Sequence, residues 1–170
     1  MNIEKFSDSN MVGFQMLSYA YKSSVKSISK PDGNLQVEIV MQSEADWKQI
    51  YFTIETGQFY IRQKSDESGN YYDIEVNVKI PKVRGNVGAL LEDLRNRDLL
   101  LKITDNNQQD WLVGTLEQPV RLKFDGVLSW NDTNSFSVQF QIESDTHPYL
   151  LTETISGGAF SNGFSNGFSI

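Results

Sequence analysis

A strict alternation of apolar and polar side chains between Tyr72 and Ile80 constrains this chain more than any other feature. The two sets are Tyr72, Ile74, Val76, Val78 and Ile80 against Asp73, Glu75, Asn77 and Lys79. Successive side chains of a strand point to opposite faces, so the pattern predicts a long strand with one buried and one solvated face. Pro81 lacks the N–H that another ladder hydrogen bond requires and is expected to end this strand.

Further strand-like segments predict a fold dominated by sheets. They lie at 35–41, 50–54, 59–61, 99–104, 111–114, 120–124 and 136–142. The segments around Ile50 and Phe59 look like a pair of strands, and 12–20 predicts a short strand or a docking segment. The turn formers of 31–34 predict a hairpin. Residues 65–70 include no apolar side chain and predict an exposed hairpin tip.

One helix is expected among these strands, at about residues 86–97. Apolar residues there follow the i, i+3, i+4, i+7 spacing of an amphipathic helix: Val87, Leu90, Leu91 and Leu94. Asn86 is placed to cap the first turn. Acidic side chains are expected early in the helix and basic ones late, which would complement the helix dipole: Glu92 and Asp93 before Arg95 and Arg97. The expected fold class is mainly β, a sandwich or barrel with this one inserted helix.

A chain of 170 residues suits one domain. We expect it over residues 1–151, with the first 34 or so either in the sheet or forming a docking extension. Residues 152–170 form an aromatic, glycine-rich tail that repeats Phe-Ser-Asn-Gly and is uncharged after Glu153. A lone domain would bury its regularly spaced aromatics poorly, so they are candidate interface residues: Phe160, Phe164 and Phe168. A disordered end is the alternative. Asp66 and Gly69, in the predicted hairpin tip, are the second candidate interface.

Composition excludes several kinds of chemistry. The chain has no cysteine, which removes disulfides and thiolate chemistry. Its formal charge of -7 and pI near 4.7 oppose specific nucleic-acid binding, but would suit a wall past which DNA slides. No apolar run approaches the roughly 20 residues that cross a bilayer, and the N-terminus does not resemble a secretory signal. We therefore expect no membrane partner and a cytosolic product, unless a larger particle carries it out.

No residue set predicts catalysis, a cofactor or a metal site. His147 is the single histidine, and without a nucleophile motif it is expected to pack or hydrogen-bond locally. The loop 105–110 offers oxygen ligands but lacks the glycine and glutamate of a calcium loop. Trp47, Trp111 and Trp130 could form a sugar-stacking platform, although core packing is the more common role of large aromatics in β domains. We expect a protein that is not an enzyme.

Several segments in order resemble structural proteins of tailed bacteriophages and prophages, over about residues 45–170. They are 47–50, the strand 71–81, the helix with 90–94, 101–105, 111–114 and the closing Gly-Phe-Ser-Asn-Gly-Phe. The resemblance implies a tail-tube-like domain that forms a ring or tube in a phage tail or neck, at the tube, terminator or tail-tip position. It also implies copies of itself and other tail or neck proteins as partners, assembly in the host cytoplasm and a place in the virion, with DNA passing through the channel. Long strand edges agree with such assembly, because they need covering.

Two alternatives to a virion subunit remain open. The first is a carbohydrate- or host-surface-binding β-sandwich of the adhesin or lectin type, which would stay discrete and bind a glycan through exposed tryptophans. The second is a hydrolase, which would need His147 beside a nucleophile in a pocket.

Overall fold

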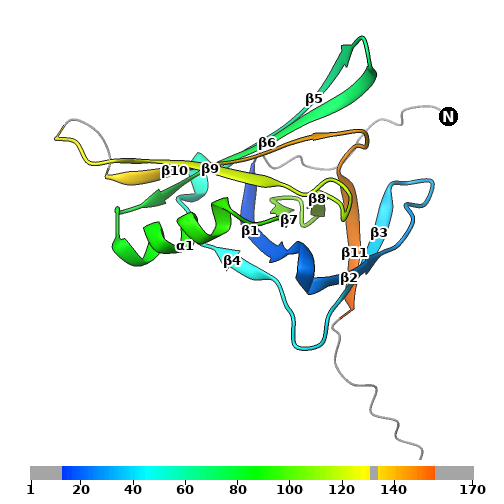
Figure 1. Cartoon of the computed structure of the whole chain (residues 1–170), viewed down its shortest axis with the longest axis horizontal. Helices are drawn as coiled ribbons and strands as arrows, with labels where there is room; N and C mark the ends of the chain where they lie inside the picture. Colours follow the sequence, from blue (N-terminus) through cyan, green and yellow to red (C-terminus); the bar gives the residue numbers. More distant parts are fainter. Residues whose placement is uncertain (1–12, 131–133, 156–170) are drawn as a thin grey trace, which may run out of the picture.

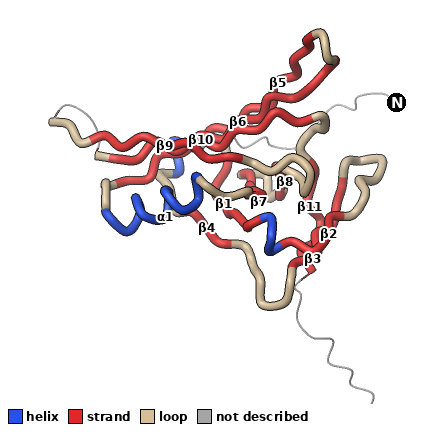
Figure 2. Tube along the Cα trace, in the orientation of Figure 1, coloured by secondary structure: helices blue, strands red, loops and turns tan. Residues whose placement is uncertain are grey.

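The fold is a β-sandwich of two sheets with one inserted helix, which confirms the expected fold class. The computed structural model of the chain describes residues 13–130 and 134–155. Figure 1 shows the smaller sheet across the top of the molecule and the larger, curled sheet below it. Strands form most of the described chain (Figure 2).

The larger sheet, sheet A, has seven strands in the order β2-β3-β11-β8-β7-β1-β4. Their bounds are β1 Phe14–Tyr21, β2 Val25–Ile28, β3 Gln36–Met41, β4 Lys48–Ile50, β7 Leu99–Asp105, β8 Asp110–Val113 and β11 Tyr149–Ile155. Its pairs are antiparallel except β11 with β3, which run parallel. The segment at 12–20 thus contributes a strand paired on both sides, and the turn at 31–34 joins β2 to β3 as predicted.

The smaller sheet, sheet B, is antiparallel, with the order β5-β6-β10-β9. Its strands are β5 Gln58–Asp66, β6 Gly69–Pro81, β9 Arg121–Val127 and β10 Ser135–Ser144. The alternation predicted between Tyr72 and Ile80 is confirmed in β6. Ile74, Val76, Val78 and Ile80 are at most 6% exposed, and the strand ends at Pro81 as predicted.

The helix α1 spans Gly85–Arg95, close to the expected bounds, and buries Leu91 and Leu94. Two details of the prediction are wrong. Arg84 rather than Asn86 precedes the first turn, and no side chain caps it. Glu92 lies in the second half of the helix, where it pairs with Arg95 instead of complementing the N-terminal dipole. Asp93 likewise pairs with Arg97, so both acidic side chains form ion pairs about one turn apart at the end of the helix.

The central strands of sheet A, above all β1 and β7, are buried on both faces. The main core lies between the two sheets and under α1, and its fully buried residues include Leu17, Leu94 and Phe140. A second core lies on the opposite face of sheet A, where the sheet curls on itself. It contains Ala20, Val25, Val37, Ile39, Met41, Leu100, Leu112 and Leu151. Simple alternation along β7 puts Leu100 on the face opposite Leu99 and Leu101. Because the second core covers that face, Leu100 is fully buried.

Two sequence expectations about strands are wrong. The segments around Ile50 and Phe59 do not pair, because β4 joins β1 in sheet A while β5 joins β6 in sheet B. The short 3-10 helix η2, Ile54–Thr56, marks the crossing between sheets, as η1, Lys22–Ser24, marks the bend between β1 and β2. Strand β11 was not predicted, although it lies inside sheet A between β3 and β8.

Candidate assembly surfaces

The β5–β6 hairpin extends away from the body of the protein (Figure 1), and we call its outer part, residues 62–73, the arm. Only Glu67 and Ser68 lie between its two strands. Gly69 has a φ of +128°, a conformation that side chains with a Cβ rarely adopt. Asp66 accepts a hydrogen bond from the Ser68 N–H over 2.7 Å. The predicted tip is therefore a tight, exposed turn, and Asp66 and Gly69 lie together in it.

Ion pairs across the two strands stiffen the arm. The Lys64 ammonium group lies 2.6 Å from the Asp73 carboxylate, and Arg62 lies 3.0 Å from Glu75. Asp73 is only 4% exposed. The hydrogen bond from Lys64 holds the pKa of Asp73 below its ordinary value and raises that of Lys64. These pairs favour one arm geometry over many, which lowers the entropy cost of any contact made by its tip.

The outer face of sheet B is polar, and its acidic and basic side chains nearly balance. The basic side chains are interspersed with the acidic ones over the four strands: Arg62, Lys64, Lys79, Arg121 and Lys123 with Asp66, Asp73, Glu75, Asp125 and Glu143. Amides occupy its centre, where Asn77 and Gln139 are opposite each other in the register. A depression of about 440 Å³ lies there, and none of its lining residues is aromatic. The charge of -7 for the whole chain is thus not concentrated on this face.

The two sheets differ in how their edges are arranged. The edge strands of sheet A are short, with four residues in β2 and three in β4. Strand β5, at one edge of sheet B, has nine residues, and its outer side has no partner strand among the residues that the structure describes. Short edges discourage pairing with another chain, whereas a long unpaired edge invites it.

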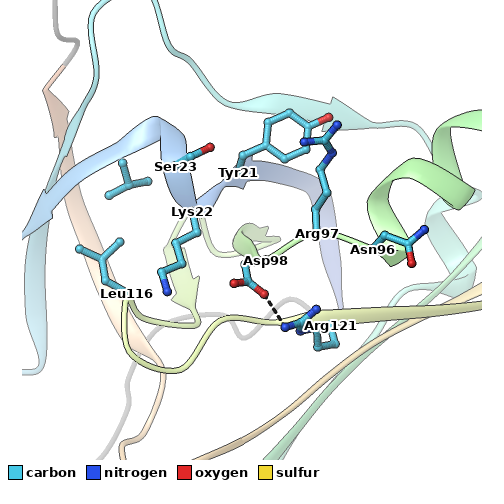
Figure 3. A pocket seen from close by; sticks show the side chains of 9 residues that line it. Tyr21, Lys22, Ser23, Asn96, Arg97, Asp98, Leu116 and Arg121 are labelled. Carbon is cyan, nitrogen blue, oxygen red and sulfur yellow. Dashed lines mark ion pairs between the residues drawn. The ribbon is translucent and has the colours of Figure 1, made fainter.

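A cavity of about 640 Å³, which we call the basic cavity, opens between η1, the end of α1 and the start of β9 (Figure 3). Three of its lining side chains are cationic and one is acidic: Lys22, Arg97 and Arg121 with Asp98. Arg121 lies 2.7 Å from Asp98. No hydrogen bond or ion pair joins the Lys22 ammonium group to another described residue.

Neighbouring contacts fix the cationic wall of the cavity. The Arg97 guanidinium group lies 5.0 Å from the centre of the Tyr21 ring and 2.8 Å from an oxygen of Asp93. This pair lowers the pKa of Asp93 and raises that of Arg97. The Lys22 backbone N–H donates to the Asp98 carbonyl over 2.9 Å, which holds η1 against the start of β7. These contacts fix the positions of Arg97 and of the Lys22 backbone, while the Lys22 ammonium group has no partner among the described residues.

His147 lies in an aromatic group rather than beside a nucleophile. Its ring centre is 5.5 Å from that of Tyr72 and 6.2 Å from that of Trp111. Its Nδ1 atom lies 2.7 Å from the Pro148 carbonyl oxygen. The prediction of local packing is confirmed, and these contacts hold the turn between β10 and β11.

The loop at 105–110 joins β7 to β8 as a hairpin, as predicted. Its first carboxylate is occupied by the chain itself, because Asp105 accepts from the backbone N–H groups of Asn107 and Gln109 and from the Trp111 indole. Within residues 13–130 and 134–155, no group of three or more His, Cys, Asp or Glu side chains could hold a metal ion.

The three tryptophans lie in three different parts of the fold. Trp47 packs on the second core and donates to Thr154, while Trp111 packs on the main core. Trp130, in the loop after β9, is 104% exposed, and Leu128 in the same loop is 72% exposed. Phe160, Phe164 and Phe168, predicted as interface residues, lie outside the described residues.

Sequence reasoning missed the basic cavity and the exposed loop. Lys22, Arg97 and Arg121 are far apart in the chain, and only the fold brings them together. A signal for the loop was available, because Leu128 and Trp130 follow the last predicted core position of β9 and precede a run of turn formers.

Searches against protein-family models, curated proteins and solved structures found no match. In the part of the chain that the structure describes, no helix combines the length and the apolar character needed to span a membrane.

Proposed function

We propose that this protein is a non-enzymatic virion structural protein, a ring- or tube-forming subunit of a bacteriophage tail or neck. Copies of the chain and other tail or neck proteins are its partners. The proposal begins from the resemblance of residues 45–170 to such proteins and is supported by the surfaces described above.

The single observation that carries the proposal is the long unpaired edge of β5, continued into the arm. Nine residues of strand present free N–H and C=O groups on one side. A discrete monomer normally blunts such an edge, as sheet A does with β2 and β4. Pairing with a neighbour around a rotation axis would cover this edge with a heterologous contact, and repetition of that contact produces a ring or a tube.

The polar face of sheet B is suited to line a channel. A wall that DNA passes must not hold phosphates tightly, and tight holding requires clustered Lys and Arg. On this face the basic groups are mixed with carboxylates and amides, and Lys64 and Arg62 are already paired. In this proposal DNA passes along the wall without specific binding.

The test is the mass of the purified protein as a function of concentration, by light scattering after size exclusion, with negative-stain imaging of the large species. We expect rings or tubes whose fraction rises with concentration. A persistent 19.3 kDa monomer without partners, together with binding of a glycan, would overturn the proposal and favour the adhesin alternative.

The aromatic tail provides a second test. The triple variant Phe160→Ser, Phe164→Ser and Phe168→Ser keeps the length of the tail but removes its aromatic side chains. We expect weaker assembly, because large aromatics contribute much of the energy of protein contacts. Ser161→Ala, Ser165→Ala and Ser169→Ala together serve as the control with aromatics intact. If the phenylalanine variant assembled as well as wild type, the aromatic side chains of the tail would not contribute to the subunit contacts.

A further inference from the structure

We propose that the basic cavity of one copy receives the arm tip of a neighbouring copy, with Glu67 of the tip paired to Lys22 of the cavity. This inference rests on the proposed function and specifies which surfaces join the subunits.

The first support is the charge of the cavity. Asp98 is compensated by Arg121 and Arg97 is shared with Asp93, so the ammonium group of Lys22 is the uncompensated charge. A carboxylate is the complementary group. It would gain a charge-assisted hydrogen bond with Lys22.

The second support is the charge of the arm tip. Asp66 and Glu67 are exposed there, and a depression beside them is also lined by Glu143 and Asp145. This end of sheet B is therefore acidic. No hydrogen bond or ion pair joins the Glu67 carboxylate to another described residue, so it is available to a neighbour.

Shape agrees with charge. The tip is a two-residue turn, and the cavity of about 640 Å³ is open to solvent. The cross-strand ion pairs join the two strands of the hairpin, and Figure 1 shows the arm directed away from the body. The arm of one copy therefore docks into another copy rather than into its own cavity. Arm and cavity are different surfaces, so the contact is heterologous and propagates around a ring or along a tube.

The experiment uses two single variants of the full chain, Lys22→Glu and Glu67→Lys. Alone, each places like charges at the contact, so we expect self-association about tenfold weaker than wild type in sedimentation velocity. Mixed in equal amounts, they should associate as wild type does, because every arm can then find a cavity of opposite charge. The wild-type contact should also weaken with added salt.

Matched controls carry the same charge changes elsewhere. Lys26→Glu lies on β2 and Glu55→Lys on η2, and both positions are exposed and outside the cavity and the arm. We expect association within about twofold of wild type for each control, because isolated surface charges contribute little. Thermal unfolding of all four variants checks that they fold.

The outcomes separate this inference from the proposed function. If wild type forms rings or tubes and the two variants, alone or mixed, associate equally well, the arm–cavity contact is wrong and the assembly role stands. The contact would also be overturned if both variants are weakened but mixing does not restore association. Wild type could instead form only small complexes that each variant weakens and that mixing the variants restores. The arm–cavity contact would then be correct, and the proposed ring or tube would be wrong.

Discussion

At the scale of single residues, Asp73 shows how a buried carboxylate is held on an otherwise solvated face. It accepts hydrogen bonds from Lys64 over 2.6 Å and from Gln141 over 3.3 Å. Alternation along β6 predicts that Asp73 points away from the main core. Its burial cannot be predicted in this way, because it depends on the register that puts Arg62 directly opposite Asp73.

Asp73→Asn should destabilise the fold by about 1–2 kcal/mol near neutral pH, because a charge-assisted hydrogen bond to Lys64 is weakened. Urea unfolding measures this loss. Glu67→Gln, at the tip of the same hairpin, is the control and should change stability by less than about 0.5 kcal/mol.

The effect of Asp73 has a defined pH dependence. Its pKa is lowered by folding, so its contribution is complete above the unfolded value of about 3.9 and is lost as pH falls through the folded value. The difference in unfolding free energy between wild type and Asp73→Asn should therefore vanish in strong acid. A difference that stays constant down to that pH would mean that packing, not charge, makes Asp73 important.

At the scale of elements, α1 was predictable because its signal is local. The spacing of Val87, Leu91 and Leu94 defines the face that packs on the main core. The same spacing also selects Leu90, which is 42% exposed at the rim of this face. Packing against sheet B, where α1 lies near β9, decides which leucines are covered.

Leu94→Ala should cost about 2–5 kcal/mol of unfolding free energy, because it leaves a cavity at a fully buried position. Leu90→Ala removes the same atoms from a half-exposed position of the same helix and should cost less than about 1 kcal/mol. Denaturant unfolding of both variants checks the orientation of α1. Equal losses would contradict the packing described for the helix.

Strand pairing was less predictable than strand position. The apolar alternation at Ile50 and at Phe59 is real, but it does not say which sheet each strand joins, because pairing depends on residues far away in the chain. Strand β11 gave a weak signal, since Leu151 is its one buried apolar residue and a register shift follows it. Its position is determined by β3 and β8 on either side.

At the scale of the whole molecule, two cores on the faces of sheet A explain how this chain folds without a disulfide. The run Leu99-Leu100-Leu101 supplies both, since Leu99 and Leu101 join the main core and Leu100 joins the second. Such a run indicates a strand buried on both faces. Local patterns such as this leucine run could not predict the basic cavity or the arm, because both depend on how distant segments of the chain come together.

The two ends of sheet B present opposite chemistry, and this leads to a last prediction. The arm tip is acidic, whereas residues 128–130, which follow the end of β9, expose Leu128 and Trp130. In Figure 1 the arm and the end of β9 lie at opposite ends of the sheet. An exposed tryptophan two residues from an exposed leucine is a candidate for a contact with another protein. In a ring or tube, residues 128–130 would be covered by a neighbouring subunit.

Leu128→Ser with Trp130→Ser should weaken self-association about tenfold or more in sedimentation velocity, because interface tryptophans often contribute over 1 kcal/mol. The midpoint of thermal unfolding should stay unchanged, since neither side chain packs on a core. Tyr51→Ser removes another exposed aromatic, 77% exposed, and should leave association unchanged. Equal loss in the control would indicate nonspecific association through exposed apolar side chains, whereas a selective loss would place residues 128–130 at a subunit contact.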